Sequence, residues 1–268
     1  MSPICSPLKM LFAFWAFFAA SQWAPCDASA EDTLQIIGIP EDSTVQSFMG
    51  GNAWTIYLDG PIDSEAEQRF QSYVIEHKIP NYSFVILNSP GGNLFQGIKL
   101  GRLFRQHDFR TDVGISRSVP PKPFEYGPGY CYSACTLAYL GGHFRFLSKG
   151  SHYGVHRFSF PVTSANDTDL AQISSAAIVE YLREMKIDSE FFSTMTQASP
   201  SEIVEPSVEV LKELNVVNFG FDKPVWTVES RNGLVYLKGQ RDTEYGLNKF
   251  ILGCQRLTEK GLSDFSGL

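Results

Sequence analysis

The sequence predicts an α/β fold, because short apolar strands alternate with amphipathic helices across glycine-rich turns. Residues 82–87 form a continuous apolar strand, as expected where helices cover both faces of a sheet. The strand runs into the turn Asn88-Ser-Pro-Gly-Gly92, and a helix over 94–107 follows the turn. Strand, glycine turn and helix in this order form the repeating unit of such folds.

The segment before this unit supplies two further strands and a helix. Residues 33–38 and 53–58 are rich in β-branched and aromatic side chains, so both are predicted strands. A helix is predicted over 64–77, with Ser64 as its N-cap and Glu67 as the capping-box partner three residues on.

The segment after the unit begins with a proline- and glycine-rich loop over 119–130. A short helix over 133–140 follows, and its near lack of charge predicts that it is buried. The remaining predicted elements of this part are strand-like pieces over 144–147 and 151–156 and amphipathic helices over 169–186 and 207–214.

The C-terminal segment changes character. Two β-rich segments, 225–229 and 234–238, flank Asn232-Gly233, a dipeptide typical of a tight hairpin. We therefore expect a small β-hairpin extension over 219–268, following a main domain over 31–218.

The N-terminus has the layout of a secretory signal peptide. Lys9 precedes eleven apolar residues, 10–20, and Ala28-Ser-Ala30 is a small-x-small cleavage site. The alternative is an uncleaved anchor, but this apolar segment is shorter than the ~20 residues that span a bilayer. We expect a signal peptide over 1–30, a periplasmic or secreted protein, and no membrane association after cleavage.

Composition narrows the function classes. The chain of 268 residues is 43% hydrophobic and 19% charged, which favours a packed globular core. The net charge of −7, without a basic stripe, argues against a nucleic-acid partner. The histidines and cysteines lack the spacing of a metal site, and no nucleotide-binding fingerprint is present, so no metal or cofactor is expected.

Cleavage after Ala30 leaves Cys131, Cys135 and Cys254. Export makes disulfides possible. The four-residue spacing of Cys131 and Cys135 brings Cα atoms to about 6 Å on a helix, which a disulfide tolerates. Two small buried thiols are the alternative.

Three sequence features fit together: the 88–92 turn, Ser133 at a helix start, and His156 some 23 residues later. Their types, order and spacing resemble the active-site core of the Clp protease proteolytic subunit. The resemblance spans roughly residues 57–218 and is strongest to an exported branch with a C-x-S-A-C motif. It implies the stacked ββα spiral fold of Clp proteases and crotonases, here with a small C-terminal β appendage.

The same resemblance implies a serine hydrolase. Serine needs an adjacent base to become nucleophilic, and histidine can accept and return the proton. Ser133 would be the nucleophile and His156 the base. Backbone N–H groups would stabilise the oxyanion, one from Gly91 or Gly92 and one from Ala134. Taken alone, Ser133 could instead be an N-cap and His156 a core histidine.

The sequence has no aspartate at the position where the Clp family has the acid of its catalytic triad. The matching region, 203–208, contains no aspartate, although Glu205 or Ser207 could substitute. Asp167 and Asp169 follow His156 more closely, and we favour Asp169. A dyad without an acid is the remaining alternative.

The expected function is a peptidase that cuts short or unfolded peptides without ATP. One alternative is a non-catalytic module that binds an extended peptide as an added strand. A crotonase-type thioester enzyme is the other, and export away from acyl-CoA argues against it. The resemblance also implies a homo-oligomer.

Overall fold

The computed structural model describes residues 33–41, 53–158, 167–243 and 245–253 of the chain. The predicted signal peptide, 1–30, and Cys254 lie outside the described residues. The elements, in chain order, are β1 (Gln35–Pro40), β2 (Trp54–Asp59), α2 (Ala66–Glu76), β3 (Phe84–Asn88), α3 (Leu94–Gln106), β4 (Arg110–Val113), β5 (Ile115–Ser116), β6 (Tyr126–Gly127), β7 (Tyr130–Tyr132), α4 (Ala134–Leu140), β8 (His152–Gly154), α5 (Asp167–Glu184), α6 (Glu190–Gln197), α7 (Val208–Glu213), β9 (Val225–Arg231), β10 (Leu234–Arg241) and β11 (Asn248–Gly253).

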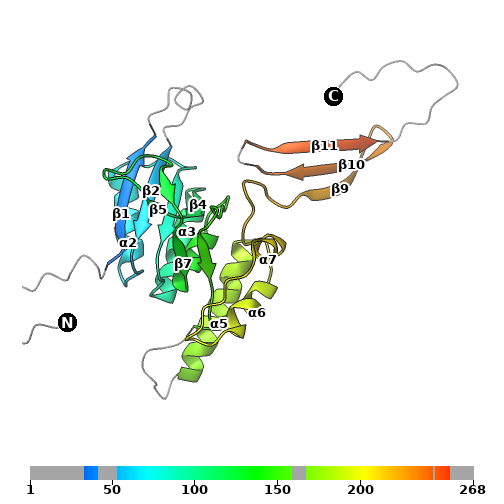
Figure 1. Cartoon of the computed structure of the whole chain (residues 1–268). Helices are drawn as coiled ribbons and strands as arrows, with labels where there is room; N and C mark the ends of the chain where they lie inside the picture. Colours follow the sequence, from blue (N-terminus) through cyan, green and yellow to red (C-terminus); the bar gives the residue numbers. More distant parts are fainter. Residues whose placement is uncertain (1–32, 42–52, 159–166, 244, 254–268) are drawn as a thin grey trace, which may run out of the picture.

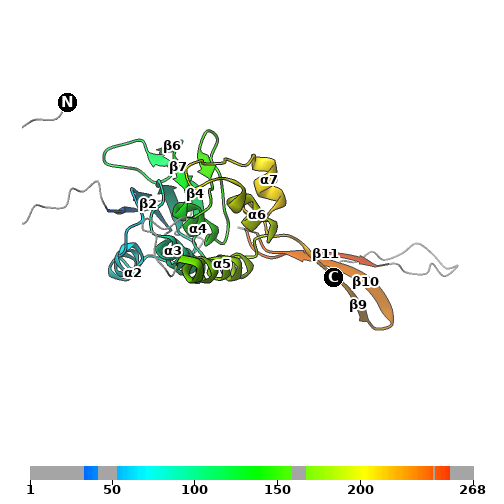
Figure 2. The ribbon, with the colours of Figure 1, turned by 90° about the horizontal axis from the view of Figure 1, so that it is seen from below.

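The predicted α/β class is confirmed. A four-stranded sheet has the order β1-β2-β3-β4, in which β1 is antiparallel to β2 and the other neighbours are parallel. The side chains of β3 are buried almost throughout, as its continuous apolar sequence predicts. Figure 2 shows α2, α3 and α5 in a row along one side of the molecule. The sheet and these helices enclose one hydrophobic core.

A second, smaller sheet carries the segment around Ser133. Strands β7 and β8 pair in parallel, and Tyr132 lies beside Gly154. The turn after β3 joins the two sheets, because Ser89 N–H donates to the carbonyl of Tyr130 at 2.8 Å and the carbonyl of Ser89 accepts from Tyr132 N–H at 3.0 Å. The 88–92 turn and the segment before Ser133 are therefore directly hydrogen-bonded.

Helix α4 packs unusually close to α3, and glycines make this possible. A Cβ on Gly97 would lie 2.4 Å from the carbonyl oxygen of Ala134, and one on Gly141 would lie 2.0 Å from that of Gly101. At such distances only glycine lets the backbones approach. This contact fixes the helix that begins just after Ser133.

Two guanidinium groups hold the C-terminal end of α4. Arg105 donates to the carbonyls of Gly141 and Gly142, at 3.0 and 2.8 Å. Arg145, which is 1% exposed, donates to Gly142 and to the carbonyls of Val216 and Asn215, each at 2.8 Å. Cationic donors satisfy the free carbonyls at a helix C-terminus, so both arginines stabilise α4 where it ends.

Several local predictions were wrong. Helix α2 begins at Ala66 with no side-chain cap on it, so the predicted capping box is not formed. The N–H of Glu67 instead donates to the side chain of Gln96 on α3, at 3.1 Å. Residues 144–147 are not a strand and contribute only a bridge between Arg145 and Thr111. Helix α6 was not predicted.

The C-terminal extension is a three-stranded antiparallel sheet, not a hairpin, because β11 pairs with the far edge of β10. The predicted turn at Asn232-Gly233 does join β9 to β10, with both residues at positive φ. Figures 1 and 2 both show this sheet projecting away from the rest of the described chain.

Candidate active site

Ser133 occupies a sharp turn between strand β7 and helix α4. Its backbone has φ 56° and ψ −125°, a region that non-glycine residues rarely adopt. Such strain costs on the order of 1–3 kcal/mol and is concentrated at functional sites. A serine on a strained strand-to-helix turn presents its hydroxyl outward, as in the nucleophile elbow of α/β-hydrolases.

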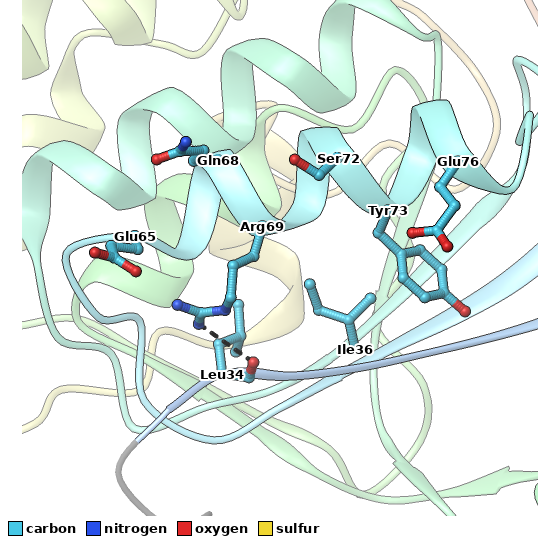
Figure 3. Close-up of a pocket in the computed structure, with 8 residues that line it drawn as sticks. All are labelled: Leu34, Ile36, Glu65, Gln68, Arg69, Ser72, Tyr73 and Glu76. Carbon is cyan, nitrogen blue, oxygen red and sulfur yellow. Dashed lines mark hydrogen bonds between the residues drawn. The ribbon is translucent and has the colours of Figure 1, made fainter. Parts of the chain in front are cut away.

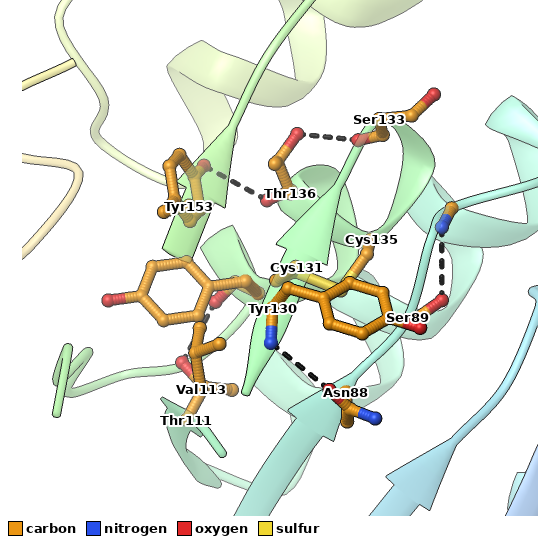
Figure 4. The surroundings of a disulfide bond; sticks show 12 residues. Asn88, Ser89, Thr111, Val113, Tyr130, Cys131, Ser133, Cys135, Thr136 and Tyr153 are labelled. Atoms are coloured by element: carbon orange, nitrogen blue, oxygen red, sulfur yellow. Dashed lines mark hydrogen bonds between the residues drawn. A yellow bond between two sulfur atoms is a disulfide. The ribbon is translucent and has the colours of Figure 1, made fainter. Parts of the chain in front are cut away.

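The side chain of Ser133 does not cap the helix. Ser133 stands at the N-cap position, but its hydroxyl makes no capping bond and no other hydrogen bond among the described residues. Figure 4 shows this hydroxyl pointing away from the disulfide beside it. The N-cap interpretation therefore explains neither the strained backbone nor the free, half-buried hydroxyl.

Covalent and hydrogen bonds hold the strained turn in place. A disulfide joins Cys131 on β7 to Cys135 on α4, so it spans Ser133 (Figure 4). The predicted pair is confirmed, but across a strand-to-helix turn rather than along one helix. Ser133 N–H donates to the carbonyl of Gly154 at 3.1 Å, and the hydroxyl of Thr136 donates to the carbonyl of Ser133 at 2.6 Å.

Gly91 and Gly92 lie against this turn. Their φ values are +99° and +138°, which side chains disfavour. A Cβ on Gly91 would lie 2.6 Å from the Cβ of Ser133 and 3.0 Å from the amide nitrogen of Ala134. A Cβ on Gly92 would lie 2.3 Å from the carbonyl oxygen of Ile62. Both positions therefore require glycine.

The backbone donors near Ser133 divide into used and unused groups. Gly91 N–H donates to the hydroxyl of Ser89 at 3.1 Å, so it already has a partner. Among the described residues, the N–H groups of Gly92 and Ala134 donate to no protein acceptor. Of the two glycines left open by the sequence, Gly92 is thus the one with a free donor. The N–H groups of Gly92 and Ala134 are thus free to donate hydrogen bonds to an oxyanion.

His156 follows β8, two residues after Gly154, whose carbonyl binds the Ser133 turn. Its Nδ1 lies 2.9 Å from the carbonyl oxygen of Arg157. A carbonyl only accepts, so Nδ1 is the donor in this contact, and in the neutral imidazole Nε2 is then the nitrogen with the lone pair. A serine and its general base are expected to lie within hydrogen-bond reach of each other. Among the described residues, no hydrogen bond joins His156 to Ser133.

Three of the four candidates for the third member of a triad are not placed beside His156. Asp169 is exposed near the start of α5, and within the described chain no hydrogen bond links it to His156. The structure does not describe the side chain of Asp167. Ser207 caps α7 by accepting from Val210 N–H. The group that orients His156 is therefore the Arg157 carbonyl, which no residue pattern could have indicated.

Glu205 binds a different histidine. Its carboxylate accepts from the hydroxyl of Tyr132 at 2.9 Å and lies 2.9 Å from Nδ1 of His152. These contacts, the one to His152 first, hold the pKa of Glu205 below its usual value. Burial first, and then the bond to Glu205, raise the pKa of Tyr132 to about 12. The cluster ties the chain before α7 to the strand preceding Ser133.

A surface hollow of about 570 Å³ lies elsewhere, between β1 and α2 (Figure 3). Arg69 reaches across it to the carbonyl of Leu34, and its guanidinium is paired with Asp63. The lining includes no residue of the Ser133 turn, so this hollow is separate from the candidate site.

No group of three or more potential metal ligands occurs among the described residues. No helix in the described ranges is long and apolar enough to cross a bilayer.

No protein-family model and no curated protein matches the chain. Solved structures with a similar shape include ClpP1 from Listeria monocytogenes, at 19% identity and a TM-score of 0.44, covering 61% of this chain and 88% of that one. An Asn-to-Asp mutant of that protein is similar at 17% identity and 0.46, with the same coverage. A Ser-to-Ala mutant of the 1510-N membrane-bound stomatin-specific protease is similar at 15% identity and 0.44, covering 60% and 75%.

Proposed function

We propose that the protein is an exported, Clp-like serine hydrolase that cuts short or unfolded peptides without ATP. The observation that carries the proposal is the conformation of Ser133. Its backbone is strained, and its hydroxyl is free of any structural hydrogen bond among the described residues. Strain of this kind persists only where the surrounding structure enforces it, which favours a functional role for the free hydroxyl.

The proposed reaction uses groups of this chain alone. The hydroxyl oxygen of Ser133 attacks a peptide carbonyl while Nε2 of His156 takes the hydroxyl proton. The N–H groups of Gly92 and Ala134 stabilise the negative oxygen that forms. His156 then gives the proton to the leaving amine, and water hydrolyses the acyl-enzyme by the same route.

The pair works as a dyad in this proposal. The Arg157 carbonyl fixes the imidazole tautomer that a general base needs. It carries no full charge, so it stabilises the imidazolium less than a carboxylate would. The contact between His156 and Ser133 would form on substrate binding, since catalytic hydrogen bonds often tighten only in the complex.

Export forms part of the proposal. The predicted signal peptide supports it, and so does the Cys131–Cys135 disulfide, because such bonds persist in oxidising compartments. Outside the cytoplasm, no ATP-driven partner unfolds substrates and delivers them to the protein. The substrates are therefore restricted to chains that are already unfolded when they reach Ser133.

A peptide-binding module is the second candidate. The observation that favours it is the missing hydrogen bond between Ser133 and His156 among the described residues. In this alternative an extended peptide pairs with the backbone beside Gly92 as an added strand.

One experiment separates the two. Fluorogenic peptides and unfolded casein are incubated with the wild type and with Ser133→Ala, in the presence and absence of ATP. The hydrolase predicts cleavage by the wild type alone, at a rate that ATP does not change. Binding of the peptides by both proteins, with no cleavage by either, would establish the binding module.

A further inference from the structure

The C-terminal sheet has two chemically different faces. The strand register places Val228, Leu237 and Leu252 in one row across the three strands. Trp226 and Phe250 form the next row on the same side, one on each side of Gly239. With Val235, these large side chains form what we call the apolar face: Trp226, Val228, Val235, Leu237, Phe250 and Leu252.

The opposite face is polar. Its centre is an ion pair between Glu229 and Lys238 at 3.0 Å, and the hydroxyl of Tyr236 donates to Glu229 at 2.8 Å. The apolar residues on this side lie opposite polar or charged cross-strand neighbours: Ile251 opposite Lys238, Leu234 opposite Arg231 and Val225 opposite Gln240. One face of the sheet is thus suited to water, and the other is suited to burial.

No other described part of the chain covers the apolar face. Its side chains are between 36% and 73% exposed, with Val228 the most exposed and Leu237 the least. At the base of the sheet, Phe221 bridges to Thr243 and Asp222 N–H donates to the carbonyl of Asp242. The carboxylate of Asp242 also lies 3.7 Å from Nε2 of His143 in the main domain. A sheet with one hydrophobic face needs a second layer to bury that face.

The apolar face also contains an anchoring feature. Trp226 lies directly over Gly239, because a Cβ on that glycine would lie 2.5 Å from the indole ring. Trp226 and Phe250 meet edge to face at 6.3 Å. A hollow of about 320 Å³ lies beside these two rings. Aromatic side chains next to a hollow that accepts a partner's side chain are typical of the energetic centre of an interface.

We propose that this face binds the same face of a second copy of the chain, forming a two-fold symmetric β-sandwich. The centre of the face carries no charge. Two copies therefore bring no like charges together, and a charged partner would find no opposite charge to pair with. Six side chains exposing on the order of 100 Å² each offer roughly 600 Å² per copy, near the ~800 Å² per partner of a standard interface.

The geometry of two sheets fits this partner. Two three-stranded sheets that pack face to face at about 10 Å bury both apolar faces in one core. A two-fold axis makes the contact self-complementary, since each patch meets its own copy. The polar faces then lie outward, in water.

The test compares substitutions on neighbouring residues of one strand. In Val228→Glu the charge falls on the apolar face, and in Thr227→Glu it falls on the polar face, opposite Lys238. Sedimentation velocity of the complete chain should show a dimer with a Kd on the order of 1 μM or tighter. Val228→Glu should weaken dimerisation at least about a hundredfold, because the dimer buries two unpaired charges, while Thr227→Glu should not.

A second measurement covers the case in which Val228→Glu disturbs the sheet itself. In the chain that begins at Glu31, which lacks Trp15 and Trp23, a Trp54→Phe substitution leaves Trp226 as the single tryptophan. Its fluorescence should shift to the red on dilution through the Kd, as the indole returns to water. A wild type that stays monomeric at a hundred times that concentration overturns the proposal.

Two further experiments test whether something other than a second copy covers the apolar face. Deleting residues 254–268 should leave the dimer intact, and a deletion that converts a monomer into a dimer would mean that this tail covers the face. A monomer that co-sediments with phosphatidylcholine–phosphatidylglycerol vesicles would mean that a membrane covers it. Either result contradicts the proposal.

Discussion

Gly91 lies so close to Ser133 that a Cβ on the glycine would come within 2.6 Å of the serine Cβ. The two residues are 42 positions apart in the sequence, yet they form one unit of the structure. The hydrogen bonds of Ser89 to Tyr130 and Tyr132 hold them together. A change at either position should therefore affect both the site and the stability of the fold.

Gly91→Ala should be destabilising by about 3 kcal/mol, since the methyl group meets the Ser133 turn and the φ of +99° is unfavourable for alanine. Urea unfolding measures this change. Gly246→Ala is the matched control, because Gly246 has a φ of +109° but a Cβ there would meet nothing within 4 Å. Its cost should be about 1 kcal/mol. Equal losses in the two variants would contradict a tight Gly91–Ser133 contact.

Ser133→Gly should stabilise the protein while removing the nucleophile. Glycine adopts φ 56° and ψ −125° without the penalty that serine has there. The free energy of unfolding should rise by about 1 kcal/mol, after allowance for the greater freedom of glycine in the unfolded chain. Ser133→Ala retains the strain and should show no such gain. The turn would be unstrained if Ser133→Gly proved less stable than Ser133→Ala.

The disulfide should matter for both stability and activity. Replacing Cys131 and Cys135 together by alanine should lower the free energy of unfolding by about 2 kcal/mol, the value expected for so short a closed loop. Catalytic activity should fall about tenfold or more, because small displacements of a nucleophile are costly. Cys254→Ala is the control and should change neither quantity. Full activity of the double variant would show that the turn holds its shape without the bond.

The Glu205 cluster should make the segment before α7 sensitive to acid. Glu205 has a lowered pKa in the folded protein, so its contribution to stability is present above the pKa of the unfolded chain. This contribution is lost as the pH falls through the lowered, folded value. Because both partners are partly exposed, the effect is small.

Hydrogen exchange measures this effect locally. The Val155 N–H donates to the carbonyl of Val204, next to Glu205, at 2.9 Å. Its protection should decline in acid in the wild type, and should already be reduced at neutral pH in Glu205→Gln. Identical protection in the two proteins at every pH would mean that Glu205 does not hold this segment.

Sequence patterns predicted the large elements well. The apolar strand at 82–87, the helix at 94–107 and the buried helix at 133–140 all appear, because length and hydrophobic periodicity suffice to identify them. Strands β5, β6 and β7 have two or three residues each, too few to show a period. Strand β11 was missed because its central apolar triplet does not alternate.

The candidate site was predicted by residue type but not by geometry. Serine and glycine in the right order indicated a nucleophile and its oxyanion donors. The strained backbone of Ser133 could not be predicted, because it is imposed by Cys135, Thr136 and Gly154 from outside the turn. The partner of His156 is a backbone carbonyl, which every residue possesses. Acid candidates chosen by residue type therefore could not include it.

The central claim is that Ser133 is an activated nucleophile. The most direct measurement is covalent labelling by a fluorophosphonate probe, with the modified residue located by peptide mass spectrometry. The wild type should carry the adduct on Ser133, and His156→Gln should react about a hundredfold more slowly because it lacks the base. Folded wild-type protein that remains unlabelled, or an adduct on another serine, would contradict the claim.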